Sequence, residues 1–523
     1  MRLLQKEPEG KRQLNKIKKE IHLMINYKIK RFLIPLGIFL FFLSPVFSQN
    51  YYSLNSDLKR AYDNIIMLKL ETGQKILDSL KIFQPENMAV YHIENYVDFF
   101  RIFINEDYNE FSILEKNKSK RLEKLKTINK NSPYYKFSIA EVNLQWALSR
   151  LKFEEYFTSL REINAAFDLL QDNKELFPEF IANNKSLSII HAIIGTLPDT
   201  YKSLLKFFSG LDGTVNQGSK EIFEVLEYSR KHDFFFRDEA YTIASFISLY
   251  LENNSQKAWK TIKSADLNIE NSPLACFVVA NIAQKTGRND LAIEILEKAP
   301  AGKNRMPFFY LDYMSGCSKL YKMDSDALLH LNSFVGNFHG KNYIKDAYLK
   351  IAWFELIVNN NEAGYWENIE KCLSQGEKIV DEDKSAYKEA MKADIPNRIL
   401  LKARLYFDGA YYFKAYVYLI HHESEFTESD KDFLEFNYRM GRILQALNSM
   451  DAINYFQTTI DIGRDNSMYF ACNAALQSGI IYEKMKEYNK AEKYYKMCLR
   501  LKPDEYKNSL HQKAKAGLMR IKQ

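Results

Sequence analysis

The sequence predicts an all-α fold in which helix hairpins stack into a solenoid. Glycine (19) and proline (12) are scarce among 523 residues, as expected for helices rather than for strands and tight turns. Tyrosine (34) and phenylalanine (36) are plentiful, and aromatic side chains suit the wedges between stacked helices. Alanine recurs at positions 415, 452 and 491, at intervals of 37 and 39 residues, which indicates a repeat array.

The clearest repeat lies at residues 473–503, which read as two short amphipathic helices. Ala475 and Gly479 share one face of the first helix, and Ala491 and Tyr495 share one face of the second. Such small residues let two helix backbones approach closely. The wedges are expected to hold the aromatic side chains of Tyr482, Tyr488 and Tyr495. This order resembles a tetratricopeptide repeat (TPR), which implies a right-handed superhelix with a concave binding groove.

Weaker copies of this pattern extend over residues 224–507. In each copy a small residue on one helix is followed by an alanine on the next: Ala244 and Ala258, Ala280 and Ala292, Gly316 and Ala327, Ala403 and Ala415, Gly441 and Ala452. Residues 343–376 form a more degenerate pair. The last segment, 508–523, is amphipathic with a cationic outer face, and we expect it to cap the array.

Charge and cysteine content exclude several classes of protein. The net charge of +7 is spread over 73 basic and 66 acidic residues, so we expect a mixed, solvated surface and no nucleic-acid partner. The five cysteines are far apart and in no CxxC arrangement, which favours buried spacers over a disulfide framework or a zinc site.

The N-terminal segment, 1–48, reads as an extension followed by a secretory signal peptide. Lys28, Lys30 and Arg31 precede an apolar run over residues 32–43, and small residues precede a cleavage site after Ser48. Met24 is the better start for such a signal. We therefore expect an exported protein, periplasmic or envelope-associated. An uncleaved membrane anchor is the alternative.

Residues 49–223 are predicted to be a divergent helical region. One helix is expected over 55–83. The charged segment 115–129 is expected to be a solvated helix face or a linker. Residues 132–173 predict a helix hairpin capped by Ser132, with inner faces that include Leu151, Tyr156 and Leu160.

Residues 185–223 are the most unusual stretch. An apolar helix is expected to end at Gly195, to turn at 196–198 and to continue as a second apolar helix over 201–208, after which glycines 210, 213 and 218 break it. A loop between helix pairs is favoured over a phosphate-binding loop, because no GK[ST] follows a strand. A lipid-touching hairpin stays open beside a buried one. The stretch also resembles a motif of the family that joins the tetratricopeptide-repeat 39 proteins and a yeast lipid-droplet and inclusion-clearance factor, which implies a lipid-related role.

No set of residues in the sequence predicts catalysis, a cofactor or a metal site. Neighbouring His421 and His422 point about 100° apart on a helix and are expected at the surface. His191 lies in an apolar helix and is expected to be a hydrogen-bonded core histidine. Gly340 and Asn342 indicate that residues 338–343 form a turn rather than a site.

A groove for a protein or peptide partner is easier to place. The resemblance assigns its lining to set positions on the first helix of each repeat, here Arg404, Phe407, Tyr438, Arg442, Gln445, Leu476, Ile480 and Glu483. Arg404 and Arg442 would lie one above the other beside Phe407 and Tyr438. An arginine pair with aromatic neighbours suits a peptide carboxylate. Intramolecular ion pairing of these arginines is the alternative.

The sequence thus predicts an exported, noncatalytic TPR scaffold that binds a protein or peptide of unknown identity. An envelope-associated lipid-handling or trafficking factor is the alternative function, and a helical enzyme of the cell wall is the third. Any membrane association is expected through the signal peptide or peripherally.

Overall fold

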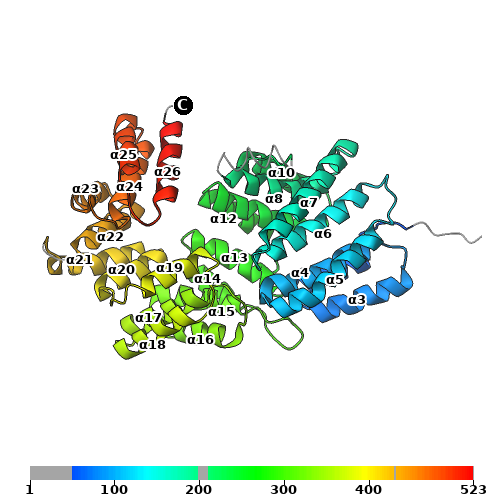
Figure 1. Cartoon of the computed structure of the whole chain (residues 1–523), viewed down its shortest axis with the longest axis horizontal. Coiled ribbons are helices and arrows are strands. Elements are labelled where there is room, and N and C mark those ends of the chain that lie inside the picture. Colours follow the sequence, from blue (N-terminus) through cyan, green and yellow to red (C-terminus); the bar gives the residue numbers. More distant parts are fainter. Residues whose placement is uncertain (1–49, 198–209, 429–430, 522–523) are drawn as a thin grey trace, which may run out of the picture. The chain divides into compact units, whose positions relative to one another are not determined.

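Helices account for all regular secondary structure that the computed structural model describes (Figure 1). It describes residues 50–197, 210–428 and 431–521; within these ranges the only β-type pairing is an isolated bridge between Tyr51 and Asn87. The predicted all-α fold class is confirmed. None of the helices in these ranges is long and apolar enough to cross a membrane. The predicted signal peptide lies outside the described residues.

The first part of the described chain is a run of helices in which each contacts the next. Their bounds are α2 Ser56–Ile66, α3 Leu70–Phe83, α4 Ala89–Asn105, α5 Tyr108–Leu125, α6 Pro133–Leu151, α7 Tyr156–Leu176, α8 Ala182–Thr196 and α10 Val215–Ser229. The predicted boundary at residue 223 falls inside α10.

The second part is a series of helix pairs, and each pair packs on the next. Their bounds are α11 Arg237–Phe246 with the π-helical turn η1 Ile247–Leu251, and α12 Ser255–Ala265; α13 Pro273–Lys285 and α14 Asn289–Glu297; α15 Tyr310–Lys322 and α16 Ala327–Asn337; α17 Ile344–Ile357, α18 Glu362–Ser374 and α19 Asp381–Ala390; α20 Arg398–Asp408 and α21 Tyr412–His421 with the 3-10 turn η2 Glu423–Glu425; α22 Phe433–Ala446 and α23 Ala452–Gly463; α24 Phe470–Lys484 and α25 Tyr488–Arg500; and α26 Lys507–Arg520. This is the TPR-like arrangement of helix hairpins that the sequence predicts, with α19 as an unpredicted extra helix.

Local capping explains where several of these helices begin. The side chains of Asn55, Ser132, Thr214 and Ser272 accept hydrogen bonds from the first-turn amides of α2, α6, α10 and α13. Each bond satisfies an amide that has no partner within its helix. Prolines follow Ser132 and Ser272, where a missing N–H costs nothing.

The predicted single helix over 55–83 is wrong, because the chain reverses between α2 and α3. Leu68 adopts a left-handed backbone (φ +56°) and is fully buried, so the apolar periodicity continues through the turn. Carbonyls around this turn accept bonds from distant residues: the Leu68 carbonyl from the Met306 amide at 2.8 Å and the Met67 carbonyl from Arg305 Nη1 at 2.8 Å. No local glycine or proline indicates the break.

The charged segment 115–129 is largely helical, but its charges are not all solvated. Arg121 is 5% exposed, and its Nη1 lies 2.5 Å from Asp98 Oδ2 on α4. Lys118 Nζ lies 2.6 Å from Glu162 Oε1 on α7. The expectation of a purely solvated face or linker is therefore wrong for these side chains.

The hairpin predicted over 132–173 is confirmed as α6 and α7, but its inner face is shorter than expected. Leu151, Tyr156 and Leu160 lie near the α6–α7 turn and are 37%, 57% and 40% exposed. Close to this turn the two helices are joined instead by polar contacts: Ser159 Oγ donates to the Ala147 carbonyl at 2.8 Å, and Arg150 Nε donates to Glu162 Oε1 at 3.0 Å.

The prediction that Gly218 breaks a helix is wrong, because this residue lies inside α10. A Cβ at Gly218 would lie 2.4 Å from the Ser188 carbonyl oxygen of α8, and one at Gly213 would lie 2.6 Å from the His191 Cα. These glycines allow α10 and the loop before it to lie directly against α8. The turn from residue 198 and the second apolar helix predicted at 201–208 lie outside the described residues.

Small residues of the last hairpins receive aromatic rings as predicted. A Cβ at Gly441 would lie 2.6 Å from the Phe456 ring, and one at Gly479 would lie 2.6 Å from the fully buried Tyr495 ring. Tyr482 stacks on Tyr494 at a centroid distance of 5.5 Å. Tyr488, however, is 48% exposed and fills no wedge.

Candidate partner-binding groove

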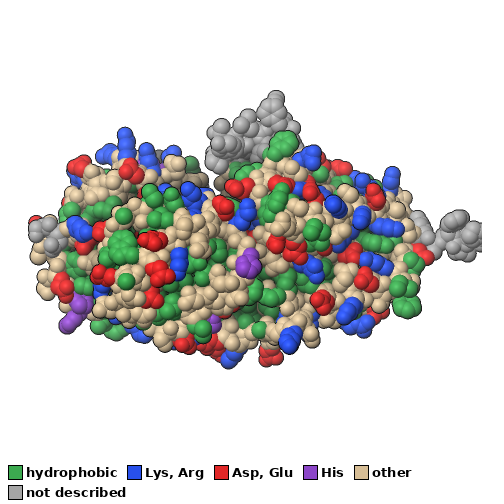
Figure 2. Space-filling view, turned by 60° about the horizontal axis from the view of Figure 1, so that its bottom comes forward, with side chains coloured by type: hydrophobic (Ala, Val, Ile, Leu, Met, Phe, Trp, Pro, Cys, Tyr) green, Lys and Arg blue, Asp and Glu red, His purple; other side chains and the backbone are tan. Residues whose placement is uncertain are grey.

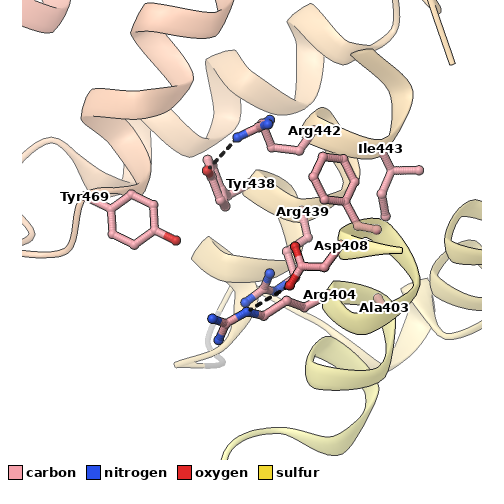
Figure 3. Close-up of a pocket in the computed structure, with 9 residues that line it drawn as sticks. Ala403, Arg404, Asp408, Tyr438, Arg439, Arg442, Ile443 and Tyr469 are labelled. Carbon is pink, nitrogen blue, oxygen red and sulfur yellow. Dashed lines mark hydrogen bonds and ion pairs between the residues drawn. The ribbon is translucent and has the colours of Figure 1, made fainter. Parts of the chain in front are cut away.

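A pocket lies where α20, α22 and the start of α24 meet. Its volume is about 270 Å³. Figure 3 shows the side chains that line it: Ala403, Arg404, Phe407, Asp408, Tyr438, Arg439, Arg442, Ile443 and Tyr469. Arg404, Phe407, Tyr438 and Arg442 belong to the groove predicted from the sequence.

Arg442 is the cation of this pocket that has no carboxylate partner among the described residues. Its guanidinium lies over the Phe407 ring, with the carbon 5.1 Å from the ring centroid. Its Nη1 donates to the Tyr438 hydroxyl oxygen at 3.2 Å (Figure 3). Its Nε is buried and has no hydrogen-bond partner there. A buried, unused donor on a charged group is unfavourable unless something accepts from it.

Tyr438 offers a second donor. Its ring is 4% exposed, and its hydroxyl oxygen accepts from Asn473 Nδ2 at 2.7 Å as well as from Arg442. A tyrosine hydroxyl has one proton to donate besides its acceptor sites. Both of its hydrogen bonds to described residues use the oxygen as acceptor, so the proton stays available.

The other two arginines of the pocket are neutralised within the chain. Arg404 Nη1 lies 3.3 Å from Glu389 Oε2 and its Nε 3.7 Å from Asp408 Oδ2. Burial disfavours its charge, but these two carboxylates raise the pKa of Arg404 above its usual value. Arg439 Nε donates to Glu435 at 2.6 Å. The alternative of intramolecular ion pairing therefore holds for Arg404, whereas Arg442 has no ion pair with a described residue.

The remaining four predicted groove residues lie outside this pocket. Leu476 is 1% exposed and belongs to the core, so its side chain offers no groove surface. Ile480 packs partly buried against the same core. Gln445 Nε2 donates to Gln477 at 3.0 Å. Glu483 accepts two bonds, at 2.7 and 2.9 Å, from Arg520 of α26.

Sequence reasoning missed five residues that line the pocket. Asp408 and Arg439 stand one turn from Arg404 and Arg442, so a search for charged neighbours at helical spacing would have found them. Tyr469 directly precedes α24 and enters from the adjacent repeat; its contact depends on how the repeats stack, which no local signal specifies.

The histidines considered in the sequence lie as predicted. His191 is 2% exposed, with Nδ1 2.6 Å from Glu221 Oε2 and Nε2 3.2 Å from Gln217 Nε2. His421 is exposed, and His422 pairs with Glu425 on the same surface turn. Among the described residues no three His, Cys, Asp or Glu side chains are grouped to hold a metal ion.

The face in Figure 2 carries Lys and Arg interspersed with Asp and Glu, consistent with a mixed surface. No basic stripe of the kind that tracks a phosphate backbone stands out on that face.

Comparison with known proteins identifies no family. No protein-family model and no curated protein match the chain. Among solved structures, a monomeric mutant of IFIT1 with m7Gppp-AAAA is 16% identical over 84% of this chain and 79% of that chain, with a TM-score of 0.29. The complex of Naa15 and Naa10 bound to HypK-THB is 13% identical over 89% of this chain and 66% of that chain, with a TM-score of 0.23. Scores this low transfer no site, and the fold assignment depends on the helix contacts described above.

Proposed function

We propose that this chain is an exported, noncatalytic scaffold whose pocket between α20 and α22 binds a carboxylate of a protein or peptide partner. The observation that carries the proposal is the pair of unused donors, Arg442 Nε and the Tyr438 hydroxyl proton, on one pocket. One carboxylate could accept from both. Charge-assisted hydrogen bonds of this kind are among the strongest in proteins.

The shape of the site favours an extended segment over a folded domain. A volume of about 270 Å³ admits a single side chain or a chain end. The Phe407 ring lies under the Arg442 guanidinium and limits how far it can turn. A planar guanidinium can pair bidentately with a carboxylate, and this geometry gives specificity as well as affinity.

The lining of the pocket supports a binding role without catalysis. It contains no histidine, cysteine, serine or lysine, and its one carboxylate, Asp408, is paired with Arg404. These are the side chains that most often act as acids, bases or nucleophiles in enzymes, and of the further residue types that can do so the lining holds only tyrosines, Tyr438 and Tyr469. Binding requires only the donors already present.

Binding is tested with random heptapeptides selected on the immobilised wild-type protein. We expect selected peptides to share an Asp, a Glu or a free C-terminus, and a matched amide version to bind at least tenfold more weakly in fluorescence anisotropy. Arg442→Gln removes the guanidinium and should weaken the acidic peptides by a similar factor.

Arg464→Gln is the matched control, because Arg464 is exposed on the surface after α23 and away from the pocket. It should leave peptide affinity unchanged. Selected peptides that carry no carboxylate, or that bind Arg442→Gln as well as wild type, would contradict the proposal.

Export is supported by the basic and apolar segments of residues 28–43 and is tested separately. We expect mature protein from an exporting bacterium to begin at Gln49, measured by mass spectrometry of its N-terminal peptide. Protein that keeps residues 24–48 and stays with membranes would show the anchor instead.

A further inference from the structure

The last hairpin brings two of the five cysteines together. Cys472 lies near the start of α24 and Cys498 near the end of α25, and their Sγ atoms are 3.6 Å apart. Both side chains are buried, at 1% and 0% exposed. A disulfide bond is about 2.05 Å long, so the two sulfur atoms must approach each other by about 1.5 Å to form one.

The other three cysteines are different. They are buried as the sequence predicted, and in the described chain none has a thiol contact of this kind. Cys276 Sγ donates to the Ile269 carbonyl at 3.0 Å. Burial raises the pKa of Cys276 to about 11, and those of Cys317 and Cys372 to about 12, so they form thiolates poorly.

The two thiols of the pair are not equivalent. The hydrogen bond between the two thiols lowers the pKa of Cys472 below the ordinary value. The same bond, together with burial, raises the pKa of Cys498. The thiolate is the nucleophile in thiol–disulfide exchange, so the direction of these two pKa shifts favours Cys472 for the first attack.

We propose that Cys472 and Cys498 are a dithiol–disulfide pair, an oxidation site that links α24 to α25 covalently when the chain meets a small organic disulfide. The inference is independent of the proposed carboxylate pocket. Access requires brief opening of α25 and α26, the last two helices of the array, which contact α24 and each other.

The reaction balances as two exchanges. The Cys472 thiolate attacks one sulfur of the organic disulfide, forms a mixed disulfide and releases one thiolate. Cys498 then loses its proton to solvent and attacks the Cys472 sulfur, which releases the second thiolate. The protein gives up two protons and two electrons, and the organic disulfide leaves as two thiols.

The link should stabilise the end of the array. It closes a loop between residues 26 apart in the sequence, which restricts the opened state more than the closed one. Amides of α24 and α25 should therefore exchange hydrogen at least tenfold more slowly after oxidation. Amides of α13 and α14 should exchange as before, because repeats couple to near neighbours.

The test uses the full mature chain and hydroxyethyl disulfide, followed by alkylation in denaturant and peptide mapping. We expect two of the five thiols to be lost, an intact mass lower by about 2 Da for two hydrogens, and one cross-linked peptide pair containing Cys472 and Cys498. Cys317→Ser should keep this link.

Cys498→Ser should stop at the mixed disulfide on Cys472, because the thiol that completes the second exchange is missing. Five free thiols after an incubation that fully oxidises the urea-unfolded chain would overturn the proposal. A link that joins any other pair of cysteines in the folded chain would overturn it as well.

Discussion

The N-terminal helices α2–α11 bury ion pairs, whereas the C-terminal hairpins α20–α25 bury small residues against aromatic rings. Lys185 of α8 is 2% exposed, and its Nζ lies 2.7 Å from Glu141 Oε2 on α6 and 2.8 Å from Glu239 Oε2 on α11. Burial disfavours its charge, yet the two carboxylates raise the pKa of Lys185 above its ordinary value. Three helices thus depend on one buried cation.

The C-terminal hairpins have no such cluster. Among described residues from 398 onward, the buried side chains are apolar or neutral, and none is charged. The Tyr495 ring instead lies between α24 and α26, where a Cβ added at Gly479 would come within 2.6 Å of it and one added at Gly517 within 2.5 Å. Its hydroxyl donates to Glu483.

The difference shows why one region follows the repeat pattern and the other does not. Small-to-aromatic packing needs the same residue types at every interface, so it recurs at a visible period. A buried ion pair is specific to its partners and is costly when either partner is missing. The N-terminal region is therefore ordered by contacts that leave no period in the sequence.

The largest expected effect is the loss of the buried cation. Lys185→Met leaves Glu141 and Glu239 without their shared partner, and we expect the N-terminal helices to lose about 3–5 kcal/mol of unfolding free energy. Hydrogen exchange of α6 and α8 measures this loss locally. Lys298→Met removes a surface cation whose side chain is 74% exposed and whose partner is Glu294, and it should leave stability nearly unchanged. Equal stability of the two variants would show that the buried ion pairs do not stabilise the N-terminal helices.

A smaller loss of stability is expected when a methyl group is added at a glycine of the C-terminal hairpins. Gly479→Ala forces the Tyr495 ring toward Gly517, where there is no room, so we expect a loss of about 1–3 kcal/mol measured by exchange of α24 amides. Gly336→Ala is the matched control, because nothing lies within 4 Å of its added Cβ. It should stabilise α16 by about 0.5–1 kcal/mol.

The N-terminal region should weaken in acid through His92. Burial, followed by the nearby Lys185 charge, lowers the pKa of His92 from 6.5 to about 3, so the unfolded chain binds this proton more readily. Stability present at neutral pH is then lost as pH falls from about 6.5 toward 3, by at most about 1.4 kcal/mol per pH unit. Urea midpoints between pH 4.5 and 7 measure the slope. His92→Gln should flatten it, and an unchanged slope would argue that His92 does not contribute.

Asp383 should produce a pH dependence of stability of opposite sign. Burial is the largest of the effects that raise the pKa of Asp383 from 3.8 to about 7, even though its carboxylate accepts from the Tyr343 and Asp346 amides at the start of α17. The folded chain keeps this proton where the unfolded chain has lost it. Its contribution to stability therefore falls as pH rises from about 4 to 7. Asp383→Asn, compared with wild type by exchange of α17 amides at pH 5 and 8, should gain relative stability at the higher pH; a constant difference would contradict this assignment.

Local residue patterns were sufficient to predict much of the fold. The small residues at 441 and 479 and the alanines at 452 and 491 identified α22–α25 as hairpins, because backbone approach requires small side chains wherever it occurs. The resemblance to a tetratricopeptide repeat likewise placed Arg404, Phe407, Tyr438 and Arg442 on one surface, and these four side chains line one pocket.

Which partner each side chain meets was decided only by the tertiary structure. Arg404 is paired with Glu389 of the unpredicted α19, and Glu483 with Arg520 of α26, while Arg442 is left without a carboxylate in the described chain. The turn at Leu68 and the meeting of Cys472 with Cys498 are also long-range outcomes. The physical reason is that periodicity reports which face of a helix is buried, whereas ion pairs, thiol contacts and apolar turns depend on residues that only folding brings near.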